Sequence, residues 1–299
     1  MPYDYEQHLS PELKSLYFED ERYRGLYKLI QSDDELVFAV RKNEIHIYYL
    51  GGRILKITGS KKLKCAFDLK YAKKRKGSDE LNEYGDIIKK LNDNPYDIDL
   101  WIENFDILKH SMKYYRENVS PNPERQLQQA LELANRDFND EVVVIDNEYG
   151  VREERVKSSK LCKVDLVAVY KDGGKYKICL IELKCGDGAI GGNSGIADHI
   201  GDYGKFLCKR KKDIIASVNN SIEYKRANAF LHNVPADLKL SEEDTEICVS
   251  VLCYDLPERQ KNKALSYIEE RKKITFDLHY NLRLKSLYHR LSKKDILGE

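Results

Sequence analysis

The stretch "KVDLVAVYKDGGKYKICLIELK", residues 163–184, decides the fold, because it predicts two buried strands joined by a tight turn. Apolar side chains fill positions 166–169 and 178–181, so both faces of each strand are expected to meet protein. The Asp172-Gly173-Gly174 segment is typical of a hairpin turn, and it predicts that the two strands run antiparallel.

Charged residues interrupt this hairpin at one end. Glu182 and Lys184 share one face of their strand, because side chains alternate with a period of two. Asp165 lies opposite Ile181 or Glu182, depending on the register. In the second register two carboxylates and a lysine converge within an apolar wall. Buried charges are costly unless they pair or bind a ligand, so both a structural ion pair and a functional site remain open.

Length and composition set limits on the class of protein. The 299 residues, 41% of them apolar, suffice for one large domain or two modest ones. The 51 Lys and Arg against 50 Asp and Glu neither demand nor exclude a polyanionic partner. No apolar run is long enough to span a membrane, and the polar start does not resemble a secretory signal. Seven cysteines without a CxxC spacing predict a reduced, cytoplasmic protein without membrane partners.

The segment "VSPNP", residues 119–123, predicts a linker between an N-terminal α+β module (1–118) and a second domain (119–299). In the module we expect helices within 1–30, three short strands within 35–57, a strand at 63–69, and helices at 79–92 and 98–117. In the second domain we expect helix 123–138, strands near 140–156, 163–170 and 176–184, helices 196–212 and 213–232, strand 246–254, helix 257–271 and strand 274–285. This mixture predicts an α/β fold with helices on both faces of a mixed sheet.

A third carboxylate is predicted to face inward from the first helix of the second domain. Its apolar stripe contains Leu127 and Leu131, and helical spacing places Glu124 on the same stripe. Glu132 lies off the stripe and is expected at the surface. Favourable placement of an acid in the first helical turn is the alternative explanation for Glu124.

Three acids and a lysine that face inward match what metal-assisted phosphodiester hydrolysis requires. Mg²⁺ prefers hard oxygen ligands and usually takes one or two carboxylates together with substrate phosphate. The metal polarises a phosphoryl oxygen and lowers the pKa of a bound water. A neighbouring lysine stabilises the charge that develops.

Asp165, followed by Glu182-Leu183-Lys184, resembles the PD-(D/E)XK nuclease superfamily, which has the restriction-endonuclease-like fold, over roughly residues 120–255. In that family a helix bearing a Glu precedes the strand with the Asp, the strand with the acid-X-Lys and a further helix. The resemblance implies that Glu124, Asp165, Glu182 and the Leu183 carbonyl hold Mg²⁺ or Mn²⁺. It also implies that Lys184 is the catalytic lysine, acting with the three acids. Val164 stands where the family motif has proline.

Residues after the lysine strand are candidates for substrate contacts. Some branches of the superfamily carry Gln-x-x-x-Tyr there, and this chain has His199 and Tyr203 at the same spacing. Plain packing is the alternative for both. The glycine-rich loop 185–195 lacks the Gly-Lys-Ser/Thr of a P-loop and either approaches phosphate closely or is an ordinary connection.

Two basic runs are candidates for contacts with nucleic acid. The run 205–212 predicts phosphate contacts by Lys205, Lys209 and Arg210, and a second run lies at 70–76. A solvated surface is the alternative for such runs.

The sequence therefore predicts a metal-dependent nuclease that acts on nucleic acid, with DNA favoured over RNA. Two alternatives stay open, an inactive nucleic-acid-binding member of the same fold and a structural or interaction protein with a buried ion pair. Substrate specificity, the biological pathway and whether the chain forms a homodimer are not indicated by the sequence.

Overall fold

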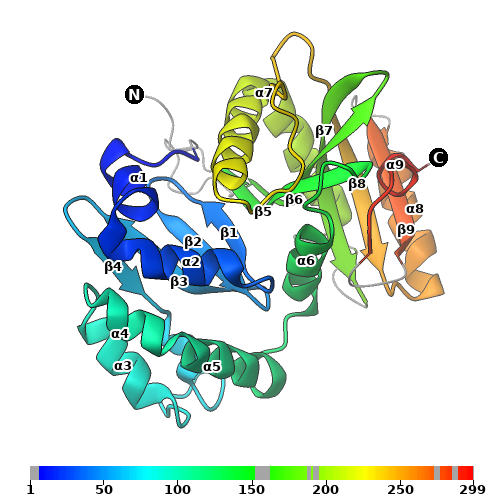
Figure 1. Cartoon of the computed structure of the whole chain (residues 1–299). Helices are drawn as coiled ribbons and strands as arrows, with labels where there is room; N and C mark the ends of the chain where they lie inside the picture. The colour runs from blue at the N-terminus through cyan, green and yellow to red at the C-terminus, as the bar shows by residue number, and fades with distance from the viewer. Residues whose placement is uncertain are drawn as a thin grey trace. The chain divides into compact units, whose positions relative to one another are not determined.

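The computed structural model describes residues 7–151, 162–186, 190, 195–272, 277–284 and 289–298. Two compact units make up the described chain, an N-terminal unit of residues 7–129 and a C-terminal unit that begins at Ala130 (Figure 1). The division lies within helix α6 (Pro123–Ala134), and Asn122 caps this helix by accepting a hydrogen bond from the Arg125 N–H through its Oδ1. The predicted boundary at residues 118–119 lies just ahead of this helix.

The N-terminal unit is built on an antiparallel sheet of four strands in the order β1-β2-β3-β4. The strands are β1 (Val37–Val40), β2 (Ile45–Tyr49), β3 (Gly52–Gly59) and β4 (Leu63–Ala66). Gly51 adopts a φ of 67° in the β2–β3 turn, and a Cβ there would lie 2.5 Å from the Arg125 carbonyl carbon. Only glycine therefore fits at position 51 of this turn.

Helices surround this sheet. They are α1 (Pro11–Phe18), α2 (Arg24–Ser32), α3 (Gly85–Asp93), α4 (Ile98–Glu103) and α5 (Phe105–Asn118), with short 3₁₀ turns at Glu21–Tyr23 and Leu69–Ala72. Helices α1 and α2 lie over one face of the sheet (Figure 1). Tyr17 of α1 is buried there and stacks on Phe38 of β1, with ring centroids 6.1 Å apart.

The C-terminal unit contains a mixed sheet of five strands in the order β5-β6-β7-β8-β9. The strands are β5 (Val142–Val151), β6 (Cys162–Asp172), β7 (Lys175–Cys185), β8 (Ile247–Tyr254) and β9 (Leu278–Leu284). Strands β5, β6 and β7 form an antiparallel meander, whereas β8 is parallel to β7 and β9 is parallel to β8. The expected α/β class with a mixed sheet is confirmed.

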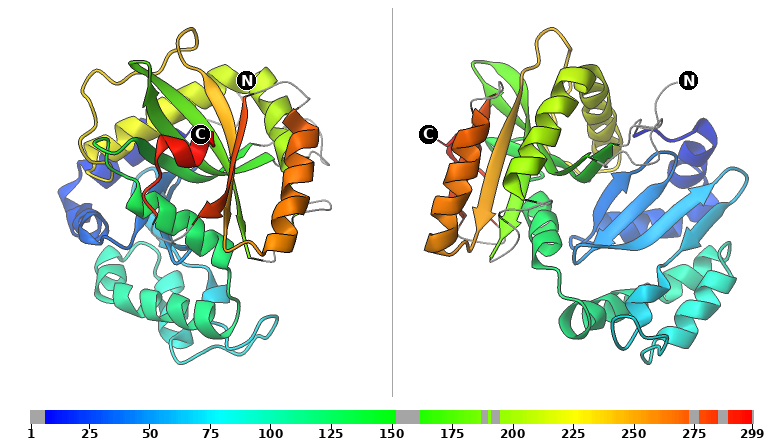
Figure 2. Two further views of the ribbon diagram at one scale, coloured as in Figure 1. Left: turned by 90° about the vertical axis from the view of Figure 1, so that its right-hand side faces the viewer. Right: turned by 180° about the vertical axis from the view of Figure 1, so that it is seen from behind.

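Helices cover both faces of the mixed sheet. Helix α7 (Ile196–Ala227) connects β7 to β8 and packs with α8 (Glu258–Lys272) on one face, and α9 (Lys293–Leu297) lies on the other (Figures 1 and 2). The two helices predicted at 196–212 and 213–232 are one helix, kinked at Arg210, where φ is −137°. Among the helices in the described part of the chain, none is long and apolar enough to cross a membrane.

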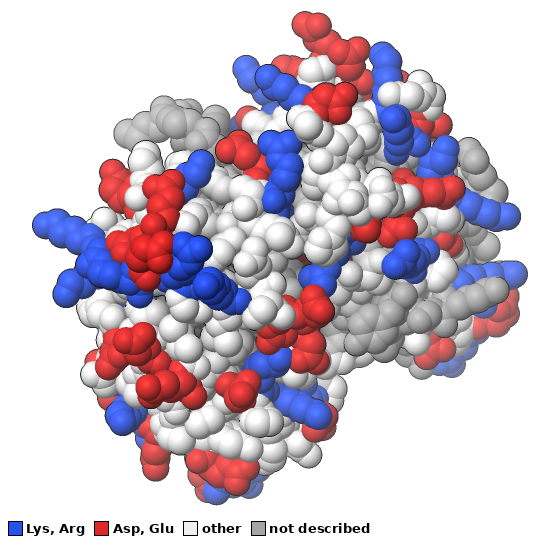
Figure 3. Space-filling view, viewed as in Figure 1, with Lys and Arg blue, Asp and Glu red and all other residues white. Residues whose placement is uncertain are grey.

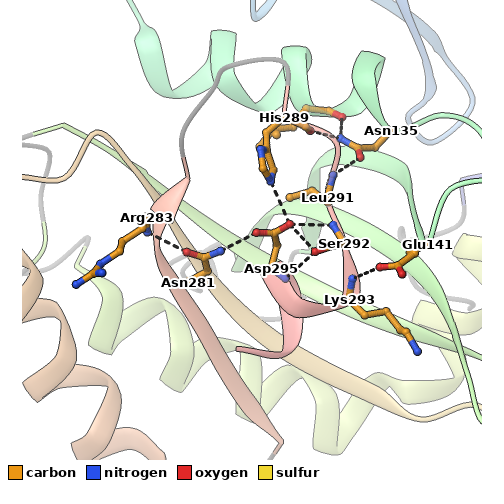
Figure 4. A network of polar contacts seen from close by, with 10 residues as sticks. Asn135, Glu141, Asn281, Arg283, His289, Leu291, Ser292, Lys293 and Asp295 are labelled. Atoms are coloured by element: carbon orange, nitrogen blue, oxygen red, sulfur yellow. Dashed lines mark hydrogen bonds and ion pairs between the residues drawn. The ribbon is translucent and has the colours of Figure 1, made fainter. Parts of the chain in front are cut away.

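A polar network holds α9 against the sheet (Figure 4). Ser292 caps the helix and exchanges hydrogen bonds with Asp295 in a capping box. Asp295 Oδ1 accepts a hydrogen bond from the Asn281 side chain of β9 at 2.9 Å, and His289 Nε2 lies 3.0 Å from Asp295 Oδ2. Asn135, which follows α6, accepts from Leu291 N at 2.6 Å and so fixes the segment that leads into α9.

Candidate active site

The β6–β7 hairpin sets the geometry of the predicted site. Gly173 and Gly174 both have positive φ, 56° and 81°, so the turn is the tight type that joins adjacent antiparallel strands. Lys171 pairs with Tyr176, and further along Leu166 pairs with Ile181. This register places Asp165 beside Glu182, which is the second of the two registers that the sequence allows.

Asp165 and Glu182 therefore lie on adjacent strands of the meander. The Asp165 carboxylate is half-buried, and its Oδ2 accepts a hydrogen bond from the Leu183 backbone N–H at 2.8 Å. This hydrogen bond holds the Asp165 side chain beside the end of β7, where Glu182 and Lys184 also lie. The predicted antiparallel pairing of these two strands is confirmed.

Glu182 is completely buried, and three side chains surround its carboxylate. The Tyr203 hydroxyl donates to Oε2 at 2.5 Å. The Lys184 ammonium and the His199 Nδ1 lie 2.6 Å and 2.8 Å from Oε1. Oε1 accepts no hydrogen bond of proper geometry, so the Lys184 ammonium acts on this oxygen through its charge.

Opposing effects set the protonation of Glu182. Burial alone raises the pKa of its carboxyl group, because the charged form loses its water. The nearby His199 and Lys184 favour the charged form and outweigh burial, so the pKa of Glu182 falls below its ordinary value. Glu182 is therefore a carboxylate at neutral pH, despite its position in the core.

Lys184 is buried as well, with a side chain 5% exposed. It pairs in register with Cys253 of β8, and burial raises the pKa of that thiol to about 12. An ammonium in such apolar surroundings depends on a partner for its charge. The structure places the Glu182 carboxylate in contact with it.

Helix α7 supplies the other two contacts of Glu182. His199 and Tyr203 lie one turn apart on the helix face that meets the sheet, with His199 26% exposed and Tyr203 fully buried. The Tyr203 hydroxyl also lies 2.9 Å from the Lys163 carbonyl oxygen. Both residues therefore hold Glu182 in place, and their predicted contacts with substrate stay a prediction.

Glu124 and Glu132 lie on either side of the division between the two units within α6. Glu124 is half-buried and belongs to the N-terminal unit, whereas Asp165 and Glu182 belong to the C-terminal one. Its role as a metal ligand stays a prediction. The expectation that Glu132 is a surface residue is wrong, because only 4% of this residue is exposed.

Glu132 takes part in a second buried ion pair, which sequence reasoning missed. Its Oε1 lies 2.5 Å from Lys225 Nζ near the end of α7, and its Oε2 accepts from Asn147 of β5 at 2.5 Å. Lys225 also donates to the Ile145 carbonyl at 2.7 Å. The pair ties α6, α7 and β5 together. No local pattern indicates a partner 93 residues away along the chain.

The basic run 205–212 is described only in part. The side chains of Lys205 and Lys209 lie outside the described residues. Arg210, at the kink of α7, donates to Asp213 at 3.1 Å, and Lys211 donates to the Glu242 carbonyl at 2.7 Å. Both cations thus have protein partners, and the phosphate contact predicted for Arg210 stays a prediction. Most of the glycine-rich loop, 187–189 and 191–194, is also outside the described residues.

The residues near the end of β7 provide oxygen atoms of the kind that a hard divalent cation binds. Asp165 and Glu182 offer carboxylate oxygens, and Glu182 Oε1 is a buried oxygen without an aligned hydrogen bond. Across the part of the chain that the structure describes, no group of three or more His, Cys, Asp or Glu side chains is gathered as a metal site. Two carboxylates still fit Mg²⁺, which usually takes one or two of them and keeps several waters.

A pocket of about 610 Å³ lies elsewhere in the C-terminal unit, among residues of α8, β9 and α9. Lys261, Tyr280 and Arg283 are among its lining residues, and none of the predicted site residues lines it. The predicted site is thus a cluster of side chains at the end of two strands rather than part of this pocket.

In comparisons with protein-family models, curated proteins and solved structures, nothing matches this chain.

Proposed function

We propose that the chain is a metal-dependent nuclease that hydrolyses phosphodiester bonds of nucleic acid, most directly DNA. The observation that carries this proposal is the buried Glu182 carboxylate in contact with Lys184, beside Asp165 on the adjacent strand. A buried charge pair contributes little net stability, so chemistry at the site is a physical reason for it.

The order of the elements gives further support. Helix α6 is followed by β5, then by β6 with Asp165, then by β7 with Glu182 and Lys184, and then by α7. This order is similar to the helix, Asp strand, acid-X-Lys strand and helix of the PD-(D/E)XK nucleases. The preference for DNA over RNA rests on that resemblance alone.

Asp165, Glu182 and the Leu183 carbonyl are the groups that would hold Mg²⁺ or Mn²⁺, with Glu124 as a further candidate. When bound, the ion supplies Lewis acidity that polarises a phosphoryl oxygen and makes a water more acidic. Tyr203 and His199 keep the Glu182 carboxylate in one orientation. Lys184 supplies a positive charge beside the carboxylates, where it would stabilise the negative charge that develops on the phosphoryl group.

A cleavage assay with several substrates tests the proposal. Linear, nicked and circular duplex DNA, single-stranded DNA and RNA are each incubated with the full chain and Mg²⁺ or Mn²⁺. We expect cleavage of at least one substrate, its loss in EDTA, and its loss in Lys184→Ala. Absence of cleavage on every substrate, or equal cleavage by Lys184→Ala, would remove the assignment.

The contact between Lys184 and Glu182 also supports a second candidate, a non-catalytic protein in which the pair is structural. The two candidates differ in their response to metal. In a structural pair the two charges neutralise each other, so Mg²⁺ is not expected to bind. A nuclease site would bind Mg²⁺, and binding would stabilise the folded protein. A thermal melt with and without Mg²⁺ therefore separates them.

A further inference from the structure

Positive charge is concentrated in the four-stranded sheet of the N-terminal unit. The whole chain is balanced, with 51 Lys and Arg against 50 Asp and Glu. Between residues 37 and 66, however, there are seven Lys and Arg and one acid, Glu44. The seven cations are Arg41, Lys42, Arg53, Lys56, Lys61, Lys62 and Lys64. Such a local excess acts on a polyanion irrespective of the net charge.

The strand register brings part of this charge onto one face of the sheet. Ile47 and Leu55 are paired and buried, on the face that α1 and α2 cover. His46 pairs with Lys56, and Thr58 pairs with Lys64, so these side chains point to the opposite face. On that opposite face Ala39 and His46 of β1 and β2 are buried, Lys56 of β3 is half-buried, and Lys64 of β4 is exposed.

The turns add more charge at one end of the same sheet. Ile45 at the start of β2 pairs with Ile57 near the end of β3, so the β1–β2 and β3–β4 turns lie at the same end. Lys42 is in the first of these turns, and Lys61 and Lys62 are in the second, all three exposed. In the space-filling view, which looks onto the side of α1 and α2, Lys and Arg side chains at the left-hand end of this unit lie together with Asp and Glu side chains (Figure 3).

Glu44, the acid within residues 37–66, offsets part of this charge. Glu44 lies 2.5 Å from Lys56 Nζ and 2.9 Å from His46 Nε2. His46 is buried, and burial together with Arg53 and Arg41 lowers its pKa to about 4 despite Glu44, so the imidazole is neutral at pH 7. Of the seven cations, Lys56 is thus the one that forms an ion pair with Glu44.

The basic run 70–76, which the sequence also singles out, differs in this respect. Lys70 lies 2.8 Å from Asp68, Lys73 lies 3.4 Å from Asp79, and Arg75 lies 3.3 Å from Glu80. Neighbouring acids therefore neutralise much of that run. The two groups of cations lie in the same unit but differ in local balance, which makes the run a matched control.

We propose that the cationic sheet surface, formed by Arg53, Lys56 and Lys64 with Lys61 and Lys62 of the adjoining turn, binds the sugar–phosphate backbone of nucleic acid. Lys and Arg contacts to phosphate position a protein on its ligand and carry no sequence information directly. The surface would hold substrate without selecting a base sequence. The ligand class rests on the proposed nuclease function, but the surface itself is assigned from charge and register.

Binding without cleavage tests this proposal. Fluorescence anisotropy of labelled duplex DNA is measured with the full chain in EDTA at several salt concentrations. The test variant is Lys61→Gln/Lys62→Gln/Lys64→Gln, three exposed positions whose change spares the core. Each lost phosphate contact should flatten the slope of log K against log salt by about 0.9, up to about 2.7 for three. At about 0.1 M salt this corresponds to roughly eightfold weaker binding for each contact.

The control variant, Lys70→Gln/Lys73→Gln/Arg75→Gln, removes the same charge from the three paired cations of the run. It should leave the slope and the Kd close to wild type. Equal effects of the two variants would mean that only net charge matters, and an unchanged slope in the sheet variant would overturn the proposal directly. Circular dichroism of both variants establishes that they are folded.

Single-stranded DNA and RNA of equal length identify which backbone the surface binds. Sensitivity of at least one of the three ligands to the sheet variant supports the proposal, and insensitivity of all three overturns it. The outcome is independent of the nuclease assignment. Cleavage with unchanged binding in the sheet variant would refute the surface alone, and weakened binding in a protein that never cleaves would refute the nuclease alone.

Discussion

Replacing Asp165 by Asn distinguishes a metal ligand from a structural charge, because Asn keeps the shape and an acceptor for the Leu183 N–H. The hydrogen bond from Leu183 N–H to Asp165 is 2.8 Å long, and the Lys184 ammonium is paired with Glu182. Turning a charge-assisted hydrogen bond into a neutral one costs about 1 kcal/mol. Relief of repulsion with the nearby Glu182 carboxylate opposes this loss. We therefore expect the metal-free variant to unfold with a free energy within about 1 kcal/mol of wild type.

Mg²⁺ should then separate the two proteins. A ligand that binds only the folded state stabilises it by about 1.4 kcal/mol when its concentration is ten times its Kd. Wild type should gain this amount, and Asp165→Asn much less. Urea unfolding followed by circular dichroism, in EDTA and in Mg²⁺, measures both quantities. Asp172→Asn is the matched control, because Asp172 is at the other end of β6 and pairs with Lys177 at the surface.

Two results would refute this reasoning. A loss of about 3–5 kcal/mol in the metal-free Asp165→Asn protein would show that Asp165 is the partner of a buried charge. Equal stabilisation of Asp165→Asn and wild type by Mg²⁺ would show that the ion binds elsewhere.

Three further predictions concern buried titratable groups. Glu132→Gln should lower the free energy of unfolding in urea by about 3–5 kcal/mol, because it leaves the buried Lys225 ammonium without its carboxylate; a loss under about 1 kcal/mol would contradict this. The lowered pKa of Glu182 means that its contribution to stability is complete above pH 4.5 and is lost as the pH falls through the lowered value. Glu182→Gln should therefore flatten the acid side of the stability profile, and an unchanged profile would count against the assigned pKa. Titration of the histidine ring protons by NMR should give His46 a pKa of about 4, and a value near 6.5 would show that its ring is hydrated.

The hairpin could be predicted from sequence because its information is local. Apolar runs on both sides of Gly173-Gly174 define two strands and leave two registers, and the structure has the one that pairs Leu166 with Ile181. The register then determines that Asp165 lies beside Glu182, and the period of two places Lys184 on the same face. The short helix α9 was missed, although Ser292 and Asp295 have the spacing of a capping box.

Helix α6 shows where a local pattern fails. The stripe of Leu127 and Leu131 assumes one buried face, but this helix serves two units. In its first part Gln129 donates to the Glu35 carbonyl of the N-terminal unit, and in its last part Glu132 pairs with Lys225 of the C-terminal unit. A helix with two buried faces can bury a carboxylate off its apolar stripe.

The rate of DNA cleavage by Lys184→Met tests the central claim most directly. Met approximates the length and volume of the lysine side chain without its charge, so the strand end stays packed. Lys175→Met, at the exposed start of the same strand, is the matched control. With protein in excess over DNA and Mg²⁺ present, we expect wild type and Lys175→Met to cleave at similar rates and Lys184→Met to cleave at least about a hundredfold more slowly. Cleavage by Lys184→Met at the wild-type rate, or cleavage by wild type that persists in EDTA, would contradict the assignment of a metal-dependent nuclease site to Asp165, Glu182 and Lys184.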